Sequence, residues 1–81
     1  MKQRKLYNRI GILRQERNIS RKELAELIGV NFQTVGYLER GEYNPSLDLA
    51  FRISEIFEIP IELIFSTSEL EPISKVLLKN K

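Results

Sequence analysis

The stretch SRKELAELIGVNFQTVGYLE, residues 20–39, has the pattern of two short helices joined by a tight turn. Ser20 followed three residues later by Glu23 is a capping box, which marks the start of the first helix. Gly29 stands where that helix must end, because glycine adopts a left-handed backbone without penalty. Asn31 is a good N-cap for the second helix. The apolar residues that this pattern turns inward are Leu24, Ala25, Ile28, Val35 and Leu38.

The second helix of such a pair is held as a rigid rod against the first. A rod of this diameter fits into the major groove of double-stranded DNA. The stretch therefore makes sequence-directed DNA binding our leading functional hypothesis.

The composition excludes several other classes of function. The chain has 81 residues, which predicts one small domain with a single hydrophobic core, and it has no cysteine and no histidine. Disulfides, thiol and imidazole catalysis and the usual zinc sites are thereby excluded, and no glycine-rich phosphate loop or calcium loop is present. We therefore expect no enzyme activity, no metal and no cofactor. No apolar stretch approaches the roughly 20 residues of a membrane span, so we expect a cytoplasmic protein, associated with the nucleoid through DNA.

Charge is distributed unevenly along the chain, although the net charge is only +2. Residues 1–22 carry eight Lys and Arg against one acid, residues 23–71 carry two against ten acids, and residues 72–81 add three lysines. A split of this kind can orient a protein on a polyanion while the far face stays acidic. It is equally compatible with a solubilising surface that is merely uneven.

The rest of the chain predicts three more helices and no strand. The first helix is expected over about residues 5–17. Ser46 can cap a fourth helix, and Pro60 suits the first turn of a short fifth helix that includes Phe65. The first helix would present one stripe made of Leu6, Ile10 and Leu13. The fold class is therefore all-α, a bundle of five short helices.

Residues 67–81 form a C-terminal tail beyond a domain that spans residues 1–66. Ser66-Thr67-Ser68 and Pro72 interrupt the helical pattern. The tail is nevertheless too apolar to be purely solvated, so it either folds back on the core, serves as a dimerisation arm or stays disordered. Its apolar residues are Leu70, Ile73, Val76, Leu77 and Leu78.

Four motifs together resemble one family, the small helix-turn-helix regulators of the phage-repressor and Cro type, or XRE family. The motifs are RIGILRQERNIS, KELAELIGV, QTVGYLERGEYNPSLDLA and PIELIF, and the resemblance runs from about Asn8 to Phe65. It implies the five-helix bundle of the lambda-repressor-like type. It also implies a transcriptional regulator that binds double-stranded DNA, most simply a repressor acting as a homodimer on a palindromic operator. The matching positions predict a partly buried ion pair between Arg14 and Glu39 that stabilises the fold.

The resemblance also implies which side chains touch DNA. Positions that match base-contacting sites are Phe32, Gln33 and Tyr37, with Thr34 close to a phosphate or a thymine methyl. Phosphate contacts are expected from Arg21, Arg40, Tyr43 and Asn44, and from free backbone amides of residues 41–46. Phe32 departs from the polar residue common at its position, so it either contacts a thymine methyl or folds inward. Glu42 is electrostatically unfavourable in a loop that is expected to contact phosphates. Gly36, inside the second helix of the pair, reflects either a close approach of that helix to the DNA groove or a neutral substitution.

The family often dimerises through its fifth helix. Candidate dimerisation residues are Ile61, Ile64, Leu70, Ile73 and Leu77. The alternative function is an antitoxin-type module that binds a protein partner through the tail and represses its own promoter.

Overall fold

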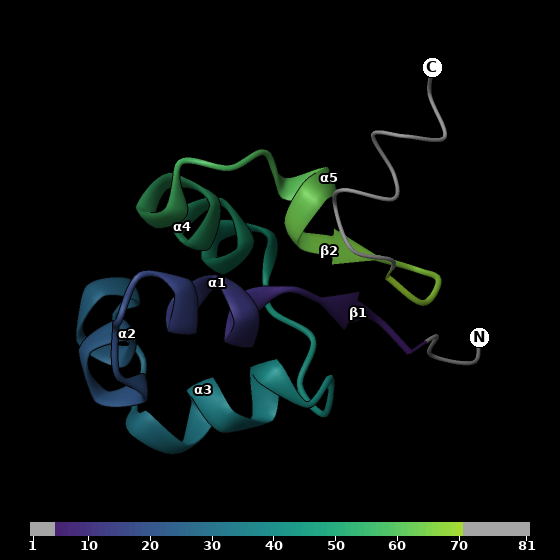
Figure 1. Ribbon diagram of the computed structural model, residues 1–81. Coiled ribbons are helices and arrows are strands. Elements are labelled where there is room, and N and C mark those ends of the chain that lie inside the picture. Colours follow the sequence, from purple (N-terminus) through teal and green to yellow (C-terminus); the bar gives the residue numbers. More distant parts are fainter. Residues whose placement is uncertain (1–4, 71–81) are drawn as a thin grey trace.

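The computed structural model describes residues 5–70 of the chain. Its elements, in chain order, are β1 (Tyr7–Asn8), α1 (Ile10–Glu16), α2 (Arg21–Ile28), α3 (Phe32–Glu39), α4 (Leu47–Phe57), α5 (Ile61–Ile64) and β2 (Phe65–Ser66). In the view of Figure 1, α1 runs through the middle of the molecule, with α4 and α5 above it and α3 below it. The predicted all-α, five-helix class is confirmed.

The helices begin and end where the local sequence signals predict. The Ser20 hydroxyl accepts a hydrogen bond from the Glu23 amide, and the Glu23 carboxylate accepts one from the Ser20 amide, which completes the capping box of α2. This bond from the Ser20 backbone lowers the pKa of Glu23 from its ordinary value, because it favours the charged carboxylate. Gly29 ends α2 with a φ of 76°, while the side chains of Asn31 and Ser46 cap α3 and α4.

A two-stranded sheet joins the two ends of the described chain, which corrects the prediction of a helix from residue 5 and of no strand. Tyr7 and Asn8 are extended and pair antiparallel with Ser66 and Phe65. The backbone turns into α1 only after Asn8, whose side-chain oxygen accepts a hydrogen bond from the Ile10 amide at 3.0 Å. Phe65 therefore belongs to β2 and not to the fifth helix.

The core lies between the helices and uses the inward positions that periodicity predicts in α2 and α3. Leu24, Ile28 and Val35 have no exposed surface, and Leu38 and Ala25 are nearly as buried. The other fully buried side chains are Ile10, Ile53, Phe57 and Ile64. Full burial of the Ile64 side chain corrects its prediction as a dimerisation residue, because it packs inside its own chain.

The tail prediction falls mostly on residues that the structure does not describe. Ile73 and Leu77 lie outside residues 5–70, and Leu70 is half-buried at the end of the described chain. Among the described residues, no helix has the length and apolar character that crossing a bilayer requires. Within the same residues, no three side chains of the metal-binding types are grouped in a way that could hold a metal ion.

Candidate nucleic-acid interface

The turn between α2 and α3 is held by backbone hydrogen bonds and leaves no flexible loop. The amides of Gly29 and Val30 both donate to the carbonyl of Ala25, at 2.9 and 3.0 Å. One residue later, the Asn31 side chain accepts from the Thr34 amide at 3.1 Å and starts α3. Because Ala25 is small and buried, it offers little obstruction to the packing of α3 against α2. The second helix is therefore fixed in direction by the first.

The outer face of α3 carries the three side chains predicted to contact bases. Phe32 and Tyr37 are 55% and 48% exposed, and Gln33 is exposed. Of the two alternatives for Phe32, the structure contradicts the inward one. Thr34 is half-buried, and its hydroxyl donates to the Asn31 side chain at 2.9 Å. Thr34 is therefore engaged in the cap of α3.

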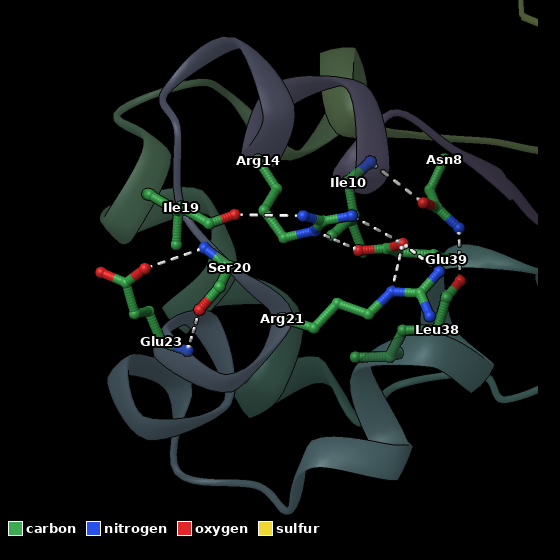
Figure 2. A network of polar contacts seen from close by, with 9 residues as sticks. All are labelled: Asn8, Ile10, Arg14, Ile19, Ser20, Arg21, Glu23, Leu38 and Glu39. Atoms are coloured by element: carbon green, nitrogen blue, oxygen red, sulfur yellow. Dashed lines mark hydrogen bonds and ion pairs between the residues drawn. The ribbon is translucent and has the colours of Figure 1, made fainter.

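Glu39, at the end of α3, is the centre of a polar network that ties three helices together (Figure 2). Arg14 of α1 approaches one side of the carboxylate, with its Nε 2.7 Å from Oε2. Arg21 of α2 approaches from another direction, with its Nε and Nη2 3.2 and 3.1 Å from Oε1. The Arg14 and Glu39 side chains are only 13% and 8% exposed, which confirms the predicted partly buried ion pair. The contact of Arg21 with the same carboxylate was not predicted.

Close packing of α1 against this network depends on Gly11. A Cβ atom added at Gly11 would lie 3.3 Å from the Glu39 Oε1 atom. A side chain at this position would therefore push against the carboxylate that binds both arginines.

Arg40 follows α3 directly and is oriented by two neighbours. Its Nε lies 2.9 Å from the Glu42 carboxylate, and its guanidinium lies 5.2 Å from the centre of the Tyr37 ring. Glu42 thus forms an ion pair with Arg40, which gives this acid a partner that sequence reasoning missed. Arg40 and Glu42 are only two residues apart in the sequence. The sequence pattern of this loop does not show, however, that their side chains turn toward each other.

The loop after α3 offers fewer backbone donors than expected. The amides of Gly41 and Glu42 donate to the carbonyls of Leu38 and Tyr37, so these two are not free for a phosphate. Tyr43 is 46% exposed and Asn44 is exposed. The side chains of the predicted phosphate contacts are therefore accessible, whereas part of the predicted backbone contribution is wrong.

The fold and this surface define a helix-turn-helix domain, and comparisons with known proteins identify its family. The family model HTH_3, described as helix-turn-helix, matches residues 2–64. The chain therefore belongs to the XRE-type helix-turn-helix family.

Relatives from archaea and from a bacterium carry the same kind of name. An uncharacterized HTH-type transcriptional regulator of Archaeoglobus fulgidus is 44% identical over 63 residues, covering 78% of this chain and 89% of the relative. One from Methanocaldococcus jannaschii is 41% identical over 58 residues, covering 72% and 88%. One from Bacillus subtilis is 39% identical over 62 residues, covering 76% and 94%.

Proposed function

We propose that this protein is a transcription regulator that binds double-stranded DNA in a sequence-specific manner through α3. The observation that carries the proposal is the division of α3 into two faces. Its inner face is buried by Val35 and Leu38, while its outer face exposes Phe32, Gln33 and Tyr37. A helix exposed in this way can enter the major groove, where each base pair presents a distinct pattern of donors and acceptors. The family and the names of the relatives support the same function.

Gln33 is the side chain best suited to read a base. Its amide both donates and accepts, so it can form two hydrogen bonds with the N6 and N7 atoms of adenine. Phe32 and Tyr37 flank it along the exposed face and present apolar surface to thymine methyl groups. Specificity in this proposal rests on these three side chains.

The chemistry around α3 supports binding of the phosphate backbone. Arg21 and Arg40 lie at the start of α2 and just after α3, with 41% and 49% of their side chains exposed. Arginine forms strong, charge-assisted hydrogen bonds to phosphate oxygens. These contacts position the domain on DNA without reading the sequence.

A homodimer on a palindromic operator, acting as a repressor, completes the proposal. One domain of this size makes few contacts, and regulators of this kind place two recognition helices about one helical turn, roughly 34 Å, apart. Large apolar side chains remain exposed on α4 and α5: Leu47 (71%), Phe51 (53%) and Leu63 (40%). Together with the half-buried Ile61, these side chains are the candidates for the contact between subunits.

Selection of bound duplexes from random DNA tests the proposal. We expect one enriched motif with two inverted half-sites for the wild-type protein. Gln33→Ala should relax the preference at one position per half-site and cost about 1–3 kcal/mol of binding free energy. Gln15→Ala, which removes an exposed glutamine from α1, is the matched control and should leave the motif unchanged. The proposal fails if the wild-type protein enriches no motif, or if both variants enrich the wild-type motif equally.

The dimer is tested separately by sedimentation of the protein with and without the selected duplex. Phe51→Ser replaces an exposed apolar side chain, so it should weaken self-association and leave the fold intact. Two protomers per duplex for the wild-type protein support the dimer, and one protomer per palindromic duplex at saturation contradicts it.

A further inference from the structure

Gly36, in the middle of α3, lies beneath the ends of two arginine side chains. A Cβ atom built on Gly36 would lie 3.2 Å from the Nη1 atom of Arg40 and 3.7 Å from the Nη1 atom of Arg21. These two nitrogens therefore approach the same point above the backbone of α3, although Arg21 begins α2 and Arg40 follows α3. Gly36 itself is buried, and the three atoms nearest to this Cβ position all belong to the two guanidinium groups.

Each arginine is held in this position by a carboxylate on its other edge. Arg21 uses its Nε and Nη2 atoms for Glu39, and Arg40 uses its Nε atom for Glu42. In both cases the Nη1 atom is the one turned toward Gly36. Within residues 5–70, neither Nη1 atom donates a hydrogen bond to another residue. Two oriented cationic donors therefore converge with their hydrogen-bonding capacity unused.

Two guanidinium groups that face one point repel each other unless an anion lies between them. Glu39 and Glu42 reduce this repulsion through their ion pairs with Arg21 and Arg40, but no carboxylate oxygen is among the three atoms nearest to the point that both Nη1 atoms approach. A phosphate placed there would accept one charge-assisted hydrogen bond of about 2.8 Å from each arginine, on two different oxygens. Because position 36 has no side chain, the two guanidinium groups can lie close to the backbone of α3 and to each other.

We propose that Arg21 and Arg40, brought together over Gly36, form a single anion site that binds one phosphodiester group of the DNA backbone. This inference rests on the proposed function for the source of the phosphate. It goes beyond that function in assigning both arginines to the same phosphate and in giving Gly36 a role in affinity. Glu39 and Glu42 are positioning residues, since each turns the Nη1 atom of its arginine toward the site.

The salt dependence of binding distinguishes one shared phosphate from two separate ones. For duplex DNA, the slope of log K against log salt concentration changes by about 0.9 for each phosphate that the protein ceases to neutralise. With a shared phosphate, Arg21→Ala and Arg40→Ala each change the slope by much less than 0.9, because the other arginine remains. The double variant then changes it by about 0.9. Separate phosphates give about 0.9 for each single variant and about 1.8 for the double variant, which would overturn the proposal.

Gly36→Leu tests the space between the arginines while both charges stay in place. The added side chain occupies the position of the two Nη1 atoms, so we expect a weakening of DNA binding on the order of tenfold and a slope change of about 0.9. Circular dichroism at the temperature of the binding assay checks that the variant is folded, since the added side chain has to displace the ends of both arginines. Lys22→Ala is the matched control, since it removes an exposed charge next to Arg21 that points elsewhere on α2. Unchanged affinity and slope in Gly36→Leu would contradict the shared site.

Titration with inorganic phosphate at low ionic strength separates this inference from the proposed function. The Nε–H signals of Arg21 and Arg40 should shift together in NMR spectra with one apparent binding constant, and Gly36→Leu should abolish both shifts. A protein that shows these shifts but selects no DNA motif keeps the anion site and loses the sequence-specific function. Independent shifts, or none, overturn the site even when DNA binding is sequence-specific.

Discussion

Replacing Arg14 by alanine removes the more buried of the two arginines that bind Glu39. Three hydrogen bonds disappear: two to the carboxylate, from Nε at 2.7 Å and Nη2 at 3.4 Å, and one from Nη1 to the Ile19 carbonyl at 3.1 Å. Glu39 is only 8% exposed, so water cannot fully replace these donors. The substitution therefore leaves a buried carboxylate with reduced compensation.

The expected cost follows from burial and from the remaining partner. Removing one member of a buried ion pair costs about 3–5 kcal/mol. Arg21 still contacts Oε1 at 3.1 Å, so Arg14→Ala should fall at the lower end, about 3 kcal/mol of unfolding free energy. For a domain of this size that corresponds to a fall of about 12–24 °C in the thermal midpoint. Arg21→Ala should cost no more than about 1 kcal/mol, because its side chain is 41% exposed and Glu39 keeps Arg14.

Urea unfolding followed by circular dichroism measures both variants against the wild-type protein. A two-state fit with a common slope gives the difference in unfolding free energy. The reasoning is refuted if Arg14→Ala costs less than about 1 kcal/mol, or if it costs no more than Arg21→Ala.

Three further predictions concern the backbone, the core and pH. Gly29→Ala should cost about 1–2 kcal/mol in urea unfolding because of its φ of 76°. Gly41→Ala should cost more, since its Cβ atom would also lie 2.9 Å from the Leu6 carbonyl oxygen, and an equal or smaller cost would contradict this. Ile53→Ala empties a fully buried position and should cost about 2–5 kcal/mol by the same measurement, whereas a cost below about 1 kcal/mol would argue against the packing. The lowered pKa of Glu23 means that its contribution to stability is complete above its ordinary value of 4.5 and is lost as pH falls through the lowered value. Glu23→Gln should therefore flatten the loss of stability as the pH falls below 4.5, and an unchanged profile would speak against the capping box.

Local signals in the sequence are sufficient to predict the two helices of the helix-turn-helix and the turn between them. Ser20, Gly29 and Asn31 each act within three or four residues of chain, so their effect can be read without knowing the rest of the fold. The capping box, the left-handed turn and the N-cap all occur where they were predicted. The inward side chains of α2 and α3 follow from helical periodicity for the same reason.

Contacts between distant parts of the chain could not be predicted in this way. Residues 5–9 carry an apolar spacing that suits a helix, but the pairing of Tyr7 with Ser66 keeps them extended. The direction in which the Ile64 side chain points likewise depends on how α5 packs against the other helices. Helical periodicity alone does not show that this side chain is fully buried inside its own chain. At the interface, the ion pair of Arg21 with Glu39 joins residues 18 positions apart. The sequence alone predicts both charges but not their contact.

The pairing of β1 with β2 has a consequence for the order in which the domain folds and opens. It brings together segments at opposite ends of the described chain, as does the bond from Arg9 to the Leu63 carbonyl across 54 residues. Closing so long a loop has a large entropic cost that few hydrogen bonds can offset before the helices between them have packed. The strand pair should therefore form last and detach first. In hydrogen exchange, its amides should open in a local step that leaves α2 and α3 protected, so that the recognition helix keeps its shape while the two ends of the domain separate and rejoin.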